Sequence, residues 1–206
     1  PNDIGSARLD RSQLQYLDPK YLTFNNGDVR YKNLKLNVFC AMDVAWSDSN
    51  LADYTAIAVI GVDSEGFIYI LDLDRFKTTK FHVYYDAAVS LQSKWGFRRM
   101  KVESNAGGKL VAQEIENLVR KNGGNLVIDC QHSSGNMGKK QERWAAILEP
   151  KYESKSVYHF KGGLMSIYEE ELMSSRPRHD DIKDAVCMAI EISKSPSGSR
   201  KLTLKD

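Results

Sequence analysis

Three apolar runs that follow one another between residues 36 and 74 constrain the fold of this chain most. They read LNVFCAMDV, TAIAVIGVD and GFIYILDLD, and near-continuous apolar runs of this length are typical of buried strands. Residues 61–66 place Val-Asp-Ser-Glu between two glycines, which predicts a turn that joins the second and third runs into a hairpin. The sequence therefore predicts three consecutive antiparallel strands.

The next part of the chain alternates between helix and strand signals. Apolar residues recur every three or four positions over residues 81–95, which predicts a helix that ends at Gly96. A strand is expected within residues 98–105, a helix over residues 107–120 and another strand over residues 125–130. Because a strand, helix, strand succession forms a parallel crossover, we expect a mixed α/β sheet of five or slightly more strands, flanked by helices.

The remaining segments carry weaker signals. Residues 1–35 show no sustained period and are interpreted as a lead-in or interdomain linker. Residues 131–143 are polar and contain glycine, which favours an exposed loop. Further expected elements are a short helix at 144–148, an edge strand at 156–160, a helix at 164–173 and a helix at about 179–193. The predicted domain covers residues 36–195, and residues 196–206 are predicted to form a flexible tail.

Composition places the chain among ordinary globular proteins. It has 206 residues, of which 42% are hydrophobic and 27% are charged, and no apolar run approaches the length of a bilayer span. The beginning of the sequence lacks a signal segment, so we expect a soluble, non-secreted protein without a membrane partner. The three cysteines lie far apart in apolar surroundings and are interpreted as buried thiols in a reducing compartment rather than a disulfide or zinc site.

Charge is distributed unevenly along the chain. The formal net charge is only +2, but residues 94–161 contain 13 Lys or Arg against 7 Asp or Glu, and residues 165–191 contain 7 acids against 3 bases. A basic surface beside an acidic pocket would suit a nucleic acid substrate. Lys139, Lys140 and Arg143 are the candidate contacts to a DNA backbone, although a solvated loop explains the same residues.

Two acidic residues end predicted strands. Asp43 follows the apolar residues 38–42, and burial of a carboxylate there is unfavourable unless a cation or hydrogen-bond donors meet it. Glu103 ends the strand within residues 98–105, and strand ends of open α/β sheets are where ligands collect. Alternatively, Asp43 is solvated beside the polar residues 47–49, and Glu103 interacts with backbone amides near the following helix.

The segment RPRHDDIKDAVCMAIEI, residues 176–192, carries the strongest local signal. Asp181 and Asp184 lie three positions apart on one face of a predicted amphipathic helix, where two like charges repel unless a cation lies between them. Favourable interaction with a helix N-terminus explains Asp180 and Asp181 equally well, but it explains Asp184 less well. His179 is a candidate for orienting a water or phosphate, or it neighbours the helix N-cap.

These acids form a set of oxygen ligands. Asp43, Glu103, Asp181 and Asp184 offer only carboxylate oxygens, which suit Mg²⁺ or Mn²⁺ better than zinc. Two such ions at a separation of about 3.5–4 Å can activate water and stabilise the leaving oxygen of a phosphodiester. Their convergence in space is a hypothesis based on their placement at strand ends.

Several motifs resemble the C-terminal nuclease domain of the large terminase subunit of tailed bacteriophages, within the ribonuclease H-like superfamily. They are AMDVAWSDSNLADYTAIAVIGVDSEGFIYILD, KVESN, RWAAILEPKYESKSVYHF and HDDIKDAVCMAI, and the resemblance extends over about residues 36–193. It implies a ribonuclease H-like fold and a metal-dependent endonuclease that cuts concatemeric double-stranded viral DNA during genome packaging. It also implies catalytic and metal-binding roles for Asp43, Glu103, Asp181 and Asp184, and adds Asp53 of ADYT as a metal-site residue.

The resemblance also implies partners. These are double-stranded DNA, the terminase ATPase domain, the small terminase subunit and the portal or procapsid, and the expected location is the host cell cytoplasm. The sequence contains no G-x-x-x-x-G-K-[ST] motif, so no ATP hydrolysis is expected from this chain.

Two other functions remain open at this point. Another ribonuclease H-like nuclease, such as a Holliday-junction resolvase, would also place paired acids on its last helix and would prefer branched DNA. A non-catalytic DNA-binding module would bind DNA without metal-dependent cleavage, and its acids would be structural.

Overall fold

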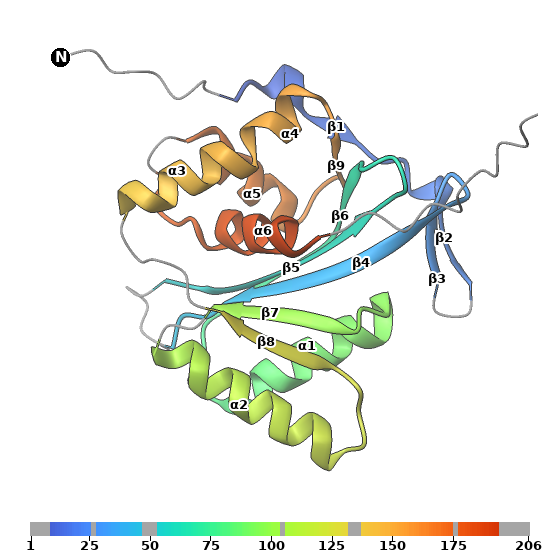
Figure 1. Ribbon diagram of the computed structural model, residues 1–206. Helices are drawn as coiled ribbons and strands as arrows, with labels where there is room; N and C mark the ends of the chain where they lie inside the picture. Colours follow the sequence, from blue (N-terminus) through green and yellow to red (C-terminus); the bar gives the residue numbers. More distant parts are fainter. Residues whose placement is uncertain are drawn as a thin grey trace, which may run out of the picture.

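A mixed β-sheet with helices on both faces forms the molecule in the computed structural model (Figure 1), which describes residues 9–25, 28–46, 53–103, 106–131, 137–174 and 177–193. Its centre consists of β4 (Leu34–Asp43), β5 (Thr55–Val62) and β6 (Ile68–Phe76), which pair antiparallel in chain order. β7 (Arg99–Glu103) pairs parallel with β4, and β8 (Val127–Gln131) pairs parallel with β7. The predicted antiparallel front and parallel back of the sheet are therefore confirmed.

The sheet extends further at its edges. β9 (Val157–His159) pairs parallel with β6, and the two-residue β1 (Gln15–Tyr16) pairs parallel with β9. β2 (Leu22–Asn25) and β3 (Asp28–Tyr31) form a hairpin that pairs with β4. In the described ranges the sheet thus has nine strands, and β1, β2 and β3 come from the segment expected to be a lead-in. They have only two to four residues each, too few for an alternating pattern to be recognised. The division of the chain at residue 36 stays a prediction.

The helices form two layers, one on each face of the sheet (Figure 1). α1 (Phe81–Trp95) and α2 (Ala106–Lys121) cover one face; α3 (Met137–Ile147), α4 (Glu149–Glu153), α5 (Leu164–Met173) and α6 (Asp181–Ile192) lie on the other. Two short 3₁₀ helices, Arg11–Gln13 and Pro19–Tyr21, occur near the start of the described chain. Alternate residues of β4 enter the two cores: Cys40 and Met42 face α1 and α2, whereas Ala41 faces α6. None of the helices in the described ranges is long and apolar enough to span a bilayer.

α6 packs closely against the middle of the sheet because small residues meet across the contact. Ala41 and Ala58 on the sheet and Ala185 and Ala189 on the helix are fully buried in one cluster. Without long side chains between them, the helix backbone can approach the strands. α6 begins at Asp181, so this packing places its acidic first turn beside the end of β4.

Two expectations about this part of the chain are wrong. Residues from Met137 onward, expected to continue an exposed loop, form α3, which contacts acids of α6 through Lys140 and Arg143; local composition gives no sign of such tertiary ion pairs. Cys130 is exposed, whereas Cys40 and Cys187 are buried free thiols as expected. Cys130 lies on β8, which pairs only with β7 among the described strands. At this edge of the sheet fewer neighbouring residues cover its side chain.

Candidate metal and nuclease site

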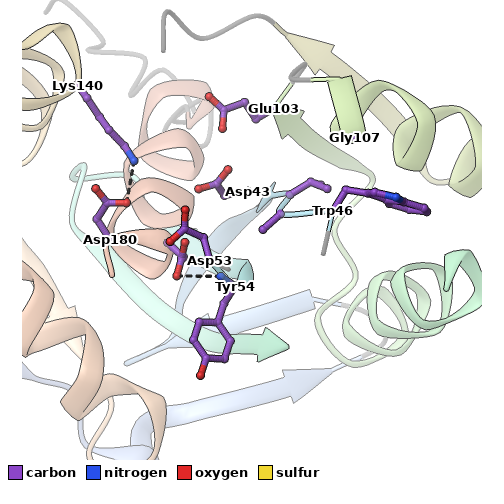
Figure 2. A pocket seen from close by; sticks show the side chains of 11 residues that line it. Asp43, Trp46, Asp53, Tyr54, Glu103, Gly107, Lys140 and Asp180 are labelled. Atoms are coloured by element: carbon purple, nitrogen blue, oxygen red, sulfur yellow. Dashed lines mark hydrogen bonds and ion pairs between the residues drawn. The ribbon is translucent and has the colours of Figure 1, made fainter. Parts of the chain in front are cut away.

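A pocket of about 460 Å³ opens where β4 and β7 end, beside the start of α6 (Figure 2). Its lining residues are Asp43, Val44, Ala45, Trp46, Asp53, Tyr54, Glu103, Gly107, Lys140, Asp180 and Asp181. Five of these side chains are carboxylates, and Lys140 is the cation among them. The pocket therefore concentrates negative charge and oxygen ligands at the strand ends.

Asp43 and Glu103 are brought together by the pairing of their strands. β4 and β7 run parallel with Met42 opposite Val102, so each acid is the next residue of its strand. Burial raises the pKa of Asp43 well above its ordinary range, and a hydrogen bond with Glu103 and the charges of Glu103 and Asp184 raise it further. Such a carboxyl group ionises readily only when a cation compensates its neighbours.

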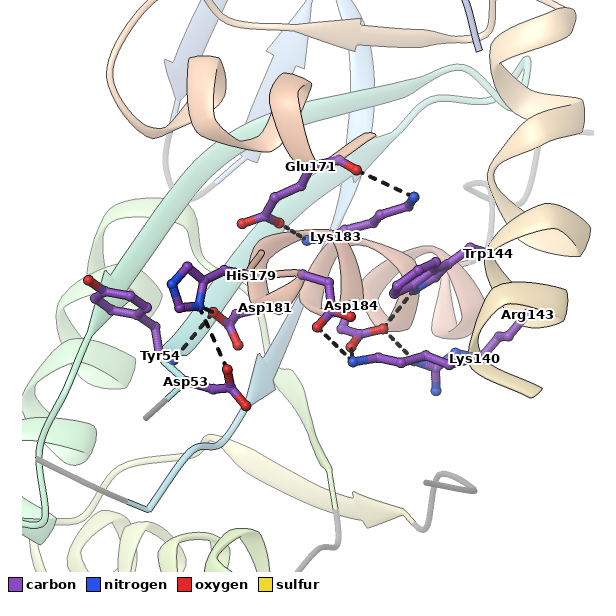
Figure 3. Close-up of polar contacts among 11 residues, drawn as sticks. Asp53, Tyr54, Lys140, Arg143, Trp144, Glu171, His179, Asp181, Lys183 and Asp184 are labelled. Carbon is purple, nitrogen blue, oxygen red and sulfur yellow. Dashed lines mark hydrogen bonds and ion pairs between the residues drawn. The ribbon is translucent and has the colours of Figure 1, made fainter. Parts of the chain in front are cut away.

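Asp184 lies one turn inside α6 and is held by α3 (Figure 3). Its Oδ1 atom accepts hydrogen bonds from Nη2 of Arg143 at 2.9 Å and from Nε1 of Trp144 at 2.7 Å, and its Oδ2 atom pairs with the ammonium group of Lys140. Only 2% of the Asp184 side chain is exposed. Burial raises its pKa, although the charge of Lys140 opposes this change.

Lys140 also contacts Asp180, with 2.7 Å between its Nζ atom and Oδ1. Burial lowers the pKa of this lysine, but the charges of Asp184 and Asp180 and its hydrogen bonds to both raise it more, so the pKa lies above its ordinary value. The lysine therefore serves as an internal counterion for two acids of the pocket region.

Asp181 has different neighbours. The backbone N–H of Tyr54 donates a hydrogen bond to its Oδ2 atom at 3.3 Å. Nδ1 of His179 lies 4.0 Å from the same oxygen and 3.7 Å from Oδ1 of Asp53, so the imidazole is close to both acids (Figure 3). Burial raises the pKa of Asp181 to about 6.

The structure thus places the predicted acids unevenly. Asp43, Glu103, Asp53 and Asp181 line the pocket, whereas Asp184 is not among its lining residues and contacts Lys140, which is. Asp181 and Asp184 share no hydrogen-bonding partner in the described residues. The expected arrangement, with one cation between the two carboxylates, would give them a common partner. Within the described part of the chain, no three His, Cys, Asp or Glu side chains already have the geometry of a metal site.

Two of the three basic residues predicted to contact DNA form ion pairs within the protein. Lys140 and Arg143 point toward acids of α6, so part of their charge is used inside the protein. The side chain of Lys139 lies outside the described residues.

Sequence reasoning did not select three residues of this region. Asp180 lines the pocket, but its place before a helix also suits a helix-dipole interaction, so nothing distinguished it. Tyr54 acts through its backbone N–H, which no side-chain pattern predicts. Trp144 has the pattern of an ordinary apolar residue of a short helix, and its position four residues after Lys140 is the available signal.

Comparison with known proteins identifies a family and solved structures to which this chain is similar. The family model described as terminase RNaseH-like domain matches residues 40–192. A search of curated protein sequences found no significant match.

Several solved structures share the fold. The large terminase nuclease of thermophilic phage G20c with bound magnesium superimposes with a TM-score of 0.61 at 15% identity and covers 93% of this chain and 99% of its own. The same nuclease has been solved with bound zinc and with bound cobalt. The human cytomegalovirus terminase nuclease domain has a TM-score of 0.59 at 14% identity, with 94% of this chain and 95% of that chain covered. The nuclease domain of Thermus phage P74-26 has a TM-score of 0.56 at 15% identity, with 89% and 92% covered.

Proposed function

The chain belongs to the terminase RNaseH-like domain family, and from this premise we propose that it is a metal-dependent endonuclease that cuts concatemeric double-stranded viral DNA during genome packaging. The observation that carries the proposal is the pocket at the ends of β4 and β7, where Asp43, Glu103, Asp53 and Asp181 converge. Its charge attracts cations, and a cation can in turn bind a phosphodiester.

The donor set fits Mg²⁺ or Mn²⁺. The pocket offers carboxylate oxygens and no cysteine, which suits hard divalent cations. Asp43 and Glu103 are the candidate ligands of one ion, and Asp181, Asp184 and Asp53 of a second. The bound ions would supply a Lewis acid that activates water and stabilises the leaving oxygen. The similar nuclease of phage G20c has been solved with bound magnesium, zinc and cobalt, which supports divalent-metal binding by this fold.

The protein's own residues have three tasks in this proposal. Asp43 holds a negative charge that is stable only beside a cation, because burial and the neighbouring Glu103 raise its pKa. Lys140 compensates Asp180 and Asp184 and must share them with any arriving metal ion. His179, whose Nδ1 lies near both Asp53 and Asp181, is the candidate to orient a water or the scissile phosphate.

The wider role is proposed from family membership. Lys139, Lys140 and Arg143 on α3 are the candidate contacts to the DNA backbone, and Lys140 also lines the pocket. The ATPase domain and small subunit of the terminase and the portal or procapsid are the proposed partners, in the host cell cytoplasm.

Cleavage of plasmid and branched DNA tests this function. The chain is incubated with supercoiled plasmid in EDTA, Mg²⁺ or Mn²⁺, beside Asp43→Asn and the control Asp86→Asn, which changes an exposed acid on α1. We expect nicking and linearisation in the presence of either metal, abolished by Asp43→Asn and retained by Asp86→Asn. Binding without cleavage under every condition would favour a DNA-binding module, and strong preference for a four-way junction would favour a resolvase.

A further inference from the structure

Trp144 joins α3 to the candidate metal site by a hydrogen bond from its indole ring. Nε1 donates to Oδ1 of Asp184 at 2.7 Å, and both side chains are almost fully buried, with 5% of Trp144 exposed (Figure 3). This is the length of a strong hydrogen bond to a charged acceptor. Because a hydrogen bond has a preferred direction, this contact favours one orientation of the Asp184 carboxylate.

The two oxygens of Asp184 are used differently. Oδ1 accepts from Trp144 and Arg143, whereas Oδ2 faces Lys140, whose side chain lines the pocket. The indole N–H is a donor without charge, so it fixes the carboxylate and leaves its negative charge in place. Oδ2 therefore faces Lys140, and a divalent cation would compete with this lysine for it.

Two lysine ammonium groups also contact the indole ring. Nζ of Lys183 lies 4.2 Å from the ring centroid and Nζ of Lys140 lies 5.5 Å from it. The ammonium group of Lys183 is held in turn, because its Nζ atom donates a hydrogen bond to the backbone carbonyl of Glu171 at 3.5 Å. A ring held by cation–π contacts and by burial has little freedom to turn away from Asp184.

We propose that Trp144 is a positioning residue that orients Asp184 so that its Oδ2 atom can bind a divalent cation. The proposal rests on the proposed metal-dependent function and assigns Trp144 no contact with DNA or with the reacting atoms. Partners that orient a metal-binding carboxylate from outside the coordination sphere affect metal affinity by about 10-fold or more when they are removed.

The chain contains a matched control away from the site. Nε1 of Trp95 donates to Oδ2 of Asp72 at 2.7 Å, and Nζ of Lys94 lies 2.7 Å from the same carboxylate oxygen and 4.9 Å from the centroid of the Trp95 ring. These are the same kinds of contact as in the group formed by Trp144, Asp184 and Lys140. Trp95→Phe therefore removes a hydrogen bond of the same kind from a residue outside the pocket.

The experiment measures Mg²⁺ binding by NMR in the wild type, Trp144→Phe and Trp95→Phe. The chain has three tryptophans, so three indole N–H signals are expected; Trp46→Phe and Trp95→Phe assign the signals of those two residues, and the remaining signal is that of Trp144. We expect Mg²⁺ and Asp184→Asn each to shift the Trp144 signal and leave the Trp95 signal in place. Backbone amide shifts around the pocket should show an apparent Kd for Mg²⁺ raised ~10-fold in Trp144→Phe and unchanged in Trp95→Phe.

Each outcome has a distinct meaning. A wild type that binds and cleaves with Mg²⁺ while Trp144→Phe has the same Kd would overturn the positioning role and leave the proposed function intact. An indole signal of Trp144 that does not respond to Asp184→Asn would also overturn it, and this readout requires no folded Trp144 variant. Absence of Mg²⁺ binding and cleavage in the wild type would overturn the proposed function and the positioning role with it.

Discussion

The ammonium group of Lys140 pairs with the carboxylates of both Asp180 and Asp184, where α3 meets the first turn of α6. A charge of this kind reduces the repulsion among the acids of the pocket region and competes with any metal ion for the same oxygens. The stability of the metal-free protein and the affinity of its metal site are therefore linked through one side chain.

Replacement of this lysine should separate the two effects. In Lys140→Gln, we expect Mg²⁺ to bind several-fold more tightly, because the competing positive charge is gone, and the metal-free protein to unfold at a lower temperature. Calorimetric Mg²⁺ titration and thermal unfolding in EDTA measure the two quantities. Lys121→Gln, at an exposed position at the end of α2, is the control. An unchanged Mg²⁺ affinity would show that Lys140 does not compete with the metal.

Glu171 should give the folded protein a pH-dependent stability. Burial raises the pKa of this residue from 4.5 to about 7, so between these values the folded state keeps a proton that the unfolded state releases. The unfolded state then binds fewer protons, and the free energy of unfolding falls as pH rises through this range. Each pKa unit of difference corresponds to about 1.4 kcal/mol.

Glu171→Gln removes this titration and retains an acceptor for the backbone N–H of Lys183. We expect the free energy of unfolding of the variant, minus that of the wild type, to increase from about pH 5 to about pH 8. Only the wild type contains the titrating carboxyl group, so only the wild type loses its contribution over this range. Urea unfolding at several pH values measures it. A constant difference across that range would contradict the raised pKa.

Close packing of α6 on the sheet should tolerate no larger side chain. Ala185 is fully buried between α6 and the strands, so Ala185→Leu should lower the free energy of unfolding by about 1–3 kcal/mol through overpacking. Ala146→Leu, at an exposed position on α3, should change it little. Equal effects of the two substitutions in chemical denaturation would mean that the contact between α6 and the sheet is looser than described.

The central fold could be predicted from the sequence because its signals are local. The apolar runs of β4, β5 and β6 are long, and the period of α1 and its end at Gly96, with a φ of 71°, are encoded in adjacent residues. The hairpin of β2 and β3 was not predicted, because such short strands are defined by pairing with β4 rather than by their own pattern.

The candidate site shows the same division. Asp43 and Glu103 could be selected because each ends a strand, and strand ends meet at one edge of the sheet. Asp184 has different partners from Asp181, because Lys140 and Trp144 of α3 contact Asp184 and the backbone of Tyr54 contacts Asp181. The contacts of Asp184 depend on how α3 lies against α6. No local pattern specifies that contact, since it joins residues about forty positions apart.

Anomalous diffraction from crystals soaked in Mn²⁺ can show whether the pocket between β4, β7 and α6 is a divalent-metal site. We expect an anomalous peak within coordination distance of Asp43 and Glu103, absent from crystals of Asp43→Asn soaked in the same way. Occupied Mn²⁺ elsewhere on the protein with no peak in this pocket would contradict it.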